Sequence, residues 1–341
     1  MTASTNSIDT GRSTPTPADS TSADLRAEGG HDNLSGKFFL VGCERSGSTM
    51  LRLMLDRHPE LSCMYESDFM VRHFERCRRG PPMVYARLLE DDWHFAHSGL
   101  AFPADAASYD EVIDAFFRQR SRATGKRVIG ATIHHDFHHL PELCAEGRYV
   151  HLVRDGRPVA SSMVQMGWAG NLYWAALRWR DTMRRLRALQ RRVPPEQWLE
   201  VRYEDLLHDP GKWLGDICAF VGVAYSEEML RYHTDSTYDP PDPANAQRWR
   251  GRLVSREIQL AEMAAGDVLD DFGYERLFPA ARPGAIERLV LRFDNRITRT
   301  RFRCGRYGTY LLVARKLWRL LGVRRAALEQ RYQAISEAHI R

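Results

Sequence analysis

Short apolar segments alternate with helical patterns along most of the chain. Residues 37–43 (KFFLVGC) form an apolar run bounded by turn residues, which is typical of a strand buried in a parallel sheet. From Ser48 the apolar residues recur at helical spacing until His58 and Pro59 end the pattern. The pattern therefore predicts a strand, a glycine turn and a helix in direct succession.

The same alternation continues downstream. Apolar runs predict strands at residues 61–65, 127–131, 149–153 and 198–203, and helical patterns predict helices at 158–166 and 172–192. Strands that alternate with helices indicate an α/β fold of three layers, with a mostly parallel central sheet flanked by helices. Ligands of such folds bind outside the carboxyl ends of the strands.

The two ends of the chain differ from the middle. Residues 1–34 carry almost no large apolar side chains, so we expect a disordered tail. Residues 35–280 are expected to form one domain, and residues 281–341, with 15 basic residues against four acidic ones, a basic helical extension. Residues 310–323 are amphipathic; a helix packed on the body with a solvated face is favoured over a membrane or nucleic-acid role.

Composition narrows the class of protein. The 341 residues are 43% hydrophobic, which is enough for a large core. The six cysteines show neither CxxC pairs nor regular spacing, which argues against a zinc ribbon or a disulfide framework. No apolar run approaches the roughly 20 residues of a membrane helix, and the first residues lack a signal pattern, so we expect a cytoplasmic protein. The net charge of +5 fits an anionic ligand without identifying one.

The first candidate for chemistry is the segment Gly42 to Thr49 (GCERSGST). It has the glycine spacing and terminal hydroxyl of a P-loop, but Ser48 stands where a P-loop has lysine. A triphosphate would be poorly held without that lysine. The N–H groups that open the following helix, together with Arg45, still predict an anion site, with an ordinary glycine turn as the alternative.

A second candidate follows the strand at 149–153. Arg154-Asp155-Gly156-Arg157 leads into a helix that Pro158 suits in its first turn, and Ser162 lies about one turn inside. Both loops follow strands of the same parallel sheet, so Arg154 and Ser162 are expected at the same edge as Arg45. The alternative is a common turn followed by a helix that happens to contain serines.

Together, CERSGSTML, LDRHPE and RDGR with Ser162 resemble the sulfotransferases that use 3′-phosphoadenosine 5′-phosphosulfate (PAPS). The first segment is nearest to the tyrosylprotein branch, and the resemblance spans residues 37–274. It implies a P-loop-like fold and transfer of a sulfuryl group from PAPS to a hydroxyl, with no metal. It also implies the cofactor-binding residues: Arg45, Ser46, Gly47, Ser48 and Thr49 for the 5′-phosphosulfate, Arg154 and Ser162 for the 3′-phosphate, Tyr203 beside the nucleotide, and Arg248 and Arg250 in a covering loop.

The resemblance also implies the catalytic residues. Glu66 falls where the tyrosylprotein branch has its catalytic glutamate, so it is expected to act as general base with Arg45 as the catalytic cation; a surface glutamate is the alternative. The lysine of a G-D-K-T-P-like stretch is absent from residues 130–134, and His134 or His135 is the candidate substitute. Asp68 replaces an arginine of that branch, so the acceptor stays open among phenols, lipids, glycans and peptides.

Other features leave alternatives open. Four histidines, at 134, 135, 138 and 139, have metal-compatible spacing, but a structural or acceptor-side role is favoured. Seven aromatic residues could line an acceptor pocket or the core: Phe69, Phe74, Trp93, Phe95, Trp168, Tyr173 and Trp174. A P-loop kinase and a non-enzymatic basic binding protein are the rival functions. A nucleic-acid partner is not expected, and peripheral membrane contact is possible but not favoured.

Overall fold

The structure is a computed structural model that describes residues 34–320, 331–332 and 335. The tail predicted for residues 1–34 lies outside the described residues except for Leu34. The strands are β1 (Gly36–Gly42), β2 (Leu61–Glu66), β3 (Val128–Ile133), β4 (Arg148–Val153) and β5 (Trp198–Arg202). Each of them overlaps a strand predicted from the apolar pattern.

Helices fill the connections. Those before β4 are α1 (Ser48–Asp56), α2 (Phe69–Arg72), α3 (Phe74–Cys77), α4 (Pro82–Leu89), α5 (Trp93–Ala96), α6 (Tyr109–Thr124), η1 (Phe137–His139) and α7 (Leu140–Leu143). Those after β4 are α8 (Gly156–Gln165), α9 (Leu172–Gln190), η2 (Pro195–Gln197), α10 (Tyr203–His208), α11 (Pro210–Val221), η3 (Glu227–Asp235), α12 (Ala244–Gln247), η4 (Arg248–Gly251), α13 (Ser255–Ala265), α14 (Val268–Asp271), α15 (Ala285–Tyr307) and α16 (Thr309–Leu320).

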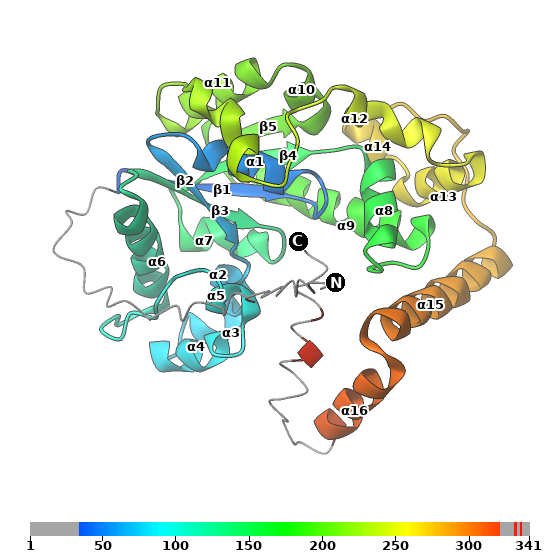
Figure 1. Ribbon diagram of the computed structural model, residues 1–341, viewed down its shortest axis with the longest axis horizontal. Coiled ribbons are helices and arrows are strands. Elements are labelled where there is room, and N and C mark those ends of the chain that lie inside the picture. Colours follow the sequence, from blue (N-terminus) through cyan, green and yellow to red (C-terminus); the bar gives the residue numbers. More distant parts are fainter. Residues whose placement is uncertain (1–33, 321–330, 333–334, 336–341) are drawn as a thin grey trace, which may run out of the picture. The chain divides into compact units, whose positions relative to one another are not determined.

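The five strands form one sheet in the order β2-β3-β1-β4-β5 (Figure 1). All four pairings are parallel, with Phe39 of β1 opposite Ala131 of β3 and Tyr149 of β4. The predicted α/β class with a parallel sheet is therefore confirmed.

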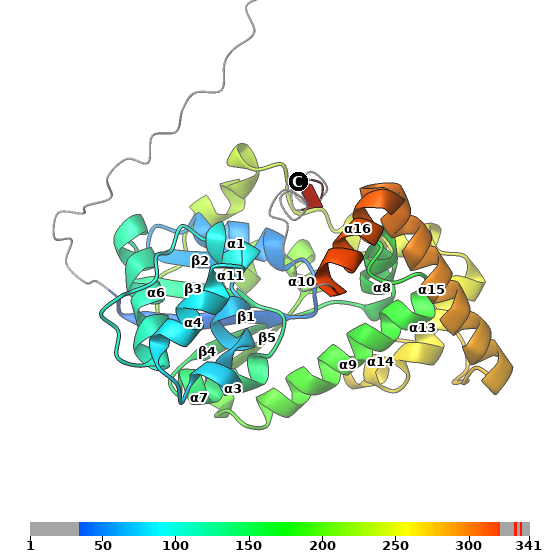
Figure 2. The same ribbon diagram turned by 90° about the horizontal axis from the view of Figure 1, so that it is seen from below.

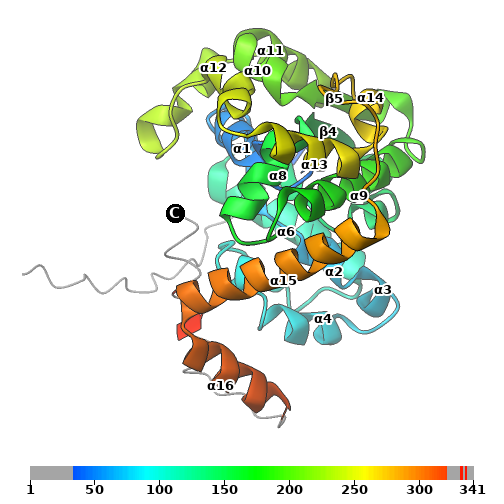
Figure 3. The same cartoon turned by 90° about the vertical axis from the view of Figure 1, so that its right-hand side faces the viewer.

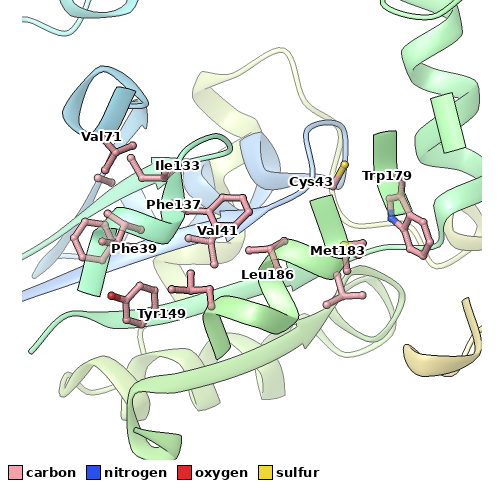
Figure 4. Packing of buried hydrophobic residues seen from close by; sticks show 14 of the residues in the cluster. Phe39, Val41, Cys43, Val71, Ile133, Phe137, Tyr149, Trp179, Met183 and Leu186 are labelled. Atoms are coloured by element: carbon pink, nitrogen blue, oxygen red, sulfur yellow. The ribbon is translucent and has the colours of Figure 1, made fainter. Parts of the chain in front are cut away.

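Alternate residues of β1 face opposite sides of the sheet, as expected for a strand. Phe39 and Val41 join the larger core with residues of α6 and α9. Figure 4 shows Phe39 and Val41 in this core with Tyr149 and Leu186. Phe38 and Leu40 join a second core with residues of α1, α10 and α11. Because helices cover both faces, β1 is buried along most of its length, which explains its continuous apolar run.

The strand order reverses at β1. The chain adds β2 and β3 on one side of β1 and then crosses to β4 and β5 on the other side. The loops that follow β1 and β4 therefore open at the same edge of the sheet, where α/β folds bind their ligands.

The helices α15 and α16 come after α14 at the carboxyl-terminal end of the described chain (Figures 2 and 3). The side chain of Asn295 accepts a hydrogen bond from the backbone N–H of Gly170 at 2.7 Å, and Asn171 donates to the carbonyl of Leu291 at 2.9 Å. One side of α15 thus lies on the start of α9. The last residues of the amphipathic segment 310–323 lie outside the described part of the chain.

All six cysteines are free thiols. Among the described residues, every helix is too short or too polar to serve as a membrane span.

Candidate active site

The loop between β1 and α1 presents a concave set of backbone N–H groups. Arg45 has φ 69° and Gly47 has φ 97°, both in the left-handed region, and Ser46 donates its N–H to the carbonyl of Cys43 at 3.1 Å. A left-handed arginine is a strained backbone position that the surrounding structure must hold. Such alternation turns successive N–H groups toward one point, and the start of α1 at Ser48 adds its unpaired donors and dipole.

Gly47 is required at its position for two reasons. Its φ of 97° is unfavourable for other residues, and a Cβ there would lie 2.5 Å from ring carbons of Tyr203. The close approach places the aromatic ring of Tyr203 directly against the loop, although the two residues are far apart in the chain. Tyr203, which the resemblance places beside the nucleotide, thus contacts the loop after β1.

The second loop touches the first. Nη1 of Arg154 donates to the backbone carbonyl of Arg45 at 3.3 Å, and the Arg154 guanidinium lies 4.0 Å from the centre of the Tyr203 ring. Nε of Arg45 donates to Oγ of Ser162 at 2.9 Å. The two candidate anion loops thus form one basic cluster around Tyr203.

A cavity of about 240 Å³ opens over this cluster. Its wall includes eight of the residues predicted from sequence: Arg45, Gly47, Ser48, Thr49, Glu66, Arg154, Ser162 and Tyr203. The other three lie elsewhere. Ser46 belongs to the loop but is fully buried, and its Oγ has no hydrogen-bond partner in the described structure. Arg248 and Arg250 lie in η4 outside the cavity wall, where Arg250 donates to Gln247 at 2.7 Å.

Glu66 reaches the cavity from the end of β2. The pairing of β2 with β3 shifts at this point: Met64 lies opposite Ala131, whereas Glu66 lies opposite Thr132, so Tyr65 is an extra residue. Such a bulge changes the direction of the following side chain and is common beside active sites. It turns the Glu66 carboxylate toward the loop after β1.

The Glu66 carboxylate has a histidine partner. Nε2 of His94, from α5, lies 3.1 Å from Oε2 of Glu66. Burial works to raise the pKa of the Glu66 carboxyl, but the hydrogen bond from His94 and the charges of His134 and His94 outweigh burial and hold the pKa below its ordinary value. Glu66 is therefore ionised at neutral pH and can accept a proton.

His134 and His135 occupy different environments. His134 is buried; its Nδ1 lies 2.9 Å from the carbonyl of Gly42 and its Nε2 lies 3.2 Å from Oγ of Ser48. Because a carbonyl only accepts, Nδ1 carries the proton and Nε2 faces Ser48 in the neutral ring. His135 instead pairs with Glu44 at 3.4 Å, and this hydrogen bond raises the pKa of His135. His134, and not His135, lines the cavity.

The four histidines at 134, 135, 138 and 139 do not converge. His139 stacks on Phe74 with ring centres 4.6 Å apart, and His138 lies on His139. Among the described residues, no group of three or more histidine, cysteine or carboxylate side chains could hold a metal ion. His134 lines the cavity itself, whereas His94 and His135 lie behind it and contact the wall residues Glu66 and Glu44.

Arg157, the last residue of the RDGR segment, has a structural role. It is buried, binds both oxygens of Asp155, and donates to Glu262 of α13 at 2.7 Å. Its guanidinium also lies 4.2 Å from the centre of the Trp249 ring. Arg157 therefore ties the second loop to α13 and to η4.

Sequence reasoning missed a hydrogen-bond partner of the cavity wall and part of the wall itself. His94 lies 28 positions from Glu66 in a helix without a motif, so no local pattern connected them. The segment from Tyr238 to Asn245 supplies Asp239 and Asp242, which had no signal in the sequence. Of the seven aromatic candidates for an acceptor pocket, Trp168 alone is in this wall, 5.8 Å from the Arg45 guanidinium, while Phe69 and Phe74 are buried in the core.

Comparison with known proteins agrees with this geometry. The profile of the sulfotransferase family matches residues 37–227, more than half of the chain. The chain therefore belongs to the sulfotransferase family, and it is an enzyme of sulfuryl transfer. This result excludes the kinase and the non-enzymatic binding protein as its primary function.

The most similar relatives include protein-tyrosine sulfotransferases, as the resemblance of the first loop predicted. Protein-tyrosine sulfotransferase 2 of Gallus gallus is 24% identical over 278 residues, which cover 72% of this chain and 70% of the relative. Protein-tyrosine sulfotransferase 1 of Danio rerio is 23% identical over 297 residues, which cover 77% and 79%. The sulfotransferase domain from the curacin biosynthetic pathway superposes with a TM-score of 0.51 at 19% identity, over 71% of this chain and 99% of that domain, which confirms the fold.

Proposed function

We propose that this sulfotransferase takes its sulfuryl group from PAPS and transfers it to a hydroxyl of an acceptor, with Glu66 as general base. The observation that carries the proposal is the single cavity that joins Arg45, Arg154 and Glu66. Two cations, a helix start and a carboxylate in one cavity fit a donor with two anionic ends and a reaction that must remove a proton.

The residues present fit such a donor better than a triphosphate. The loop after β1 offers N–H groups, hydroxyls and Arg45, but Ser48 occupies the P-loop lysine position. Arg154 and Ser162 offer a second cation and a hydroxyl to a separate phosphate. The carboxylates of Asp239 and Asp242 line the same cavity and would repel phosphate, so they belong to the side that faces the nucleoside.

Bound PAPS would supply the sulfuryl group and 3′-phosphoadenosine 5′-phosphate as the leaving group. In the transfer, the acceptor oxygen forms a bond to sulfur, the bond from sulfur to the phosphate oxygen breaks, and the hydroxyl proton passes to Glu66. Arg45 and the N–H groups of the loop stabilise charge on the oxygens around sulfur and on the departing phosphate. His134 holds the Ser48 hydroxyl in place within this set.

A thermal-shift experiment tests the donor. We expect 3′-phosphoadenosine 5′-phosphate to raise the melting temperature equally with and without Mg²⁺, whereas ATP gives a small shift in either condition. Ligand at 100 times its dissociation constant stabilises by about 2.7 kcal/mol, which is readily measured. A large shift that requires both ATP and Mg²⁺ would overturn the proposal.

A further inference from the structure

The helix α15 has an exposed apolar face that packing on the body does not explain. Its inward residues, such as Leu291 and Phe302, are only partly exposed. Five other apolar side chains recur at helical spacing and are at least half exposed: Ile286, Leu289, Val290, Phe293 and Ile297. We call these five residues the apolar stripe. Side chains three and four positions apart share one helix face, so the stripe is continuous.

The short helix α16 adds to this surface. Tyr310 is 79% exposed, Val313 51% and Leu317 54%. Scattered apolar side chains are normal on a protein surface, but a row of five between Ile286 and Ile297 of α15, followed by three more on the next helix, indicates a binding surface. The sequence favoured a helix that packs on the body and exposes a solvated face. Such a helix would not be expected to expose these apolar side chains.

The charges beside the stripe indicate what binds there. Helix α15 carries seven arginines and two acidic residues, and α16 has three basic residues and none that are acidic. Arg288, Arg292, Arg296, Arg299 and Arg303 recur three or four positions apart and are exposed, so they form a basic row along one flank of the stripe. An apolar face with arginines on its flank is the pattern of a helix that lies in the surface of an anionic bilayer.

We propose that the apolar stripe of α15, continued by α16, docks this enzyme on a bilayer that contains anionic lipids. Phe293 and Ile297 insert among the acyl chains, and the arginine row binds the headgroups. A second copy of the chain would cover the stripe, but it would bring its own arginine row close to the first, which like-charge repulsion opposes.

The surface is connected to the reaction cavity. Arg299 and Arg303 line a groove of about 350 Å³ that also includes Glu44 and Trp168, two residues of the cavity wall. Docking would therefore bring the groove close to lipid headgroups. The docking proposal does not depend on the proposed function.

Co-sedimentation of the full chain with lipid vesicles tests the proposal. We expect binding to vesicles of phosphatidylcholine mixed with phosphatidylglycerol, weak binding to phosphatidylcholine alone, and release by high salt. Phe293→Glu with Ile297→Glu should weaken binding at least about tenfold, because two apolar side chains lose their burial. Arg292→Gln with Arg296→Gln should weaken binding only to the anionic vesicles. The matched control is Met83→Glu, which changes a 57% exposed apolar side chain of α4 and should bind like the unaltered chain.

Other outcomes overturn the proposal. These are no binding of the unaltered chain, equal binding to both kinds of vesicle, or a dimer in light scattering that the Phe293→Glu and Ile297→Glu pair dissociates without any effect on vesicles. Preferential binding of DNA by the arginine row, with vesicles left unbound, would also overturn it. Each variant is first checked for its thermal shift with 3′-phosphoadenosine 5′-phosphate, so a failure of folding or of the proposed function is distinguished from a failure of docking.

Discussion

Nη1 of Arg154 donates a hydrogen bond to the backbone carbonyl of Arg45 at 3.3 Å. Arg45 lies in the loop after β1 and Arg154 in the loop after β4, so their contact joins the two loops. The side chain of Arg45 extends the link to Ser162 at 2.9 Å. A donor that used Arg45 at one end and Ser162 at the other, as proposed, would exchange this hydrogen bond for bonds to its own oxygens.

Replacement of Glu66 by Gln tests the general base. The amide is similar in shape but cannot accept the hydroxyl proton, so kcat should fall by about 10² to 10⁴. The dissociation constant of 3′-phosphoadenosine 5′-phosphate, measured by calorimetry, should stay within about twofold, since Glu66 does not bind the phosphates in this account. Full turnover by the Gln variant would remove Glu66 from the role.

His94→Ala tests the partner of that base. The hydrogen bond from His94 helps to hold the pKa of Glu66 below its ordinary value, so its removal raises that pKa. The base must be ionised, and the acid limb of the pH profile of kcat/KM should therefore move to higher pH. His97→Ala is the matched control, because His97 lies near the same helix and stacks on Trp93 with ring centres 4.5 Å apart. An acid limb at the same pH in both variants contradicts the assignment.

The two candidate histidines can be separated by substitution. His134 holds both the Gly42 carbonyl and the Ser48 hydroxyl, whereas His135 pairs with Glu44. We expect His134→Ala to reduce kcat at least about tenfold, because one hydrogen bond is lost. A tenfold reduction corresponds to about 1.4 kcal/mol in the free energy of the transition state. His135→Ala should have a smaller effect. The opposite order in steady-state assays would assign the role to His135.

Arg157→Ala tests the structural tie behind the second loop. It would leave Asp155 and Glu262 as buried carboxylates without their cation, which costs about 3 to 5 kcal/mol in the free energy of unfolding. Arg78→Ala removes a comparable ion pair, with Glu142, on the surface and should cost less than about 1 kcal/mol. Urea denaturation measures both values. Equal losses in the free energy of unfolding would mean that the buried Arg157 network stabilises the fold no more than a surface ion pair does.

The fold and the two loops could be predicted because their signals are local. The apolar run of β1, the glycine spacing and the start of α1 are contiguous, and each element follows from the residues within it. The resemblance implied that Tyr203 lies beside the nucleotide. Its contact with the loop, where a Cβ on Gly47 would lie 2.5 Å from the Tyr203 ring, appears only in three dimensions.

The remaining features depend on long-range packing. His94 reaches Glu66 from a four-residue helix, and Arg157 reaches Glu262 across 105 positions, so neither partnership has a periodic signature. The apolar stripe of α15 was hidden for another reason. Sequence periodicity shows that a helix has an apolar face, but not which of its apolar residues the body covers.

In the proposed mode of binding, the loops after β1 and β4 hold opposite ends of one donor. Calorimetry can test it with 3′-phosphoadenosine 5′-phosphate and with AMP, which lacks the 3′-phosphate. The unaltered enzyme should prefer the first ligand by at least about tenfold, from one charge-assisted hydrogen bond or more. Arg154→Ala should abolish this preference, whereas Arg45→Ala should weaken both ligands and keep it. If Arg154→Ala retains the full preference, Arg154 does not bind the 3′-phosphate and the two-loop account is wrong.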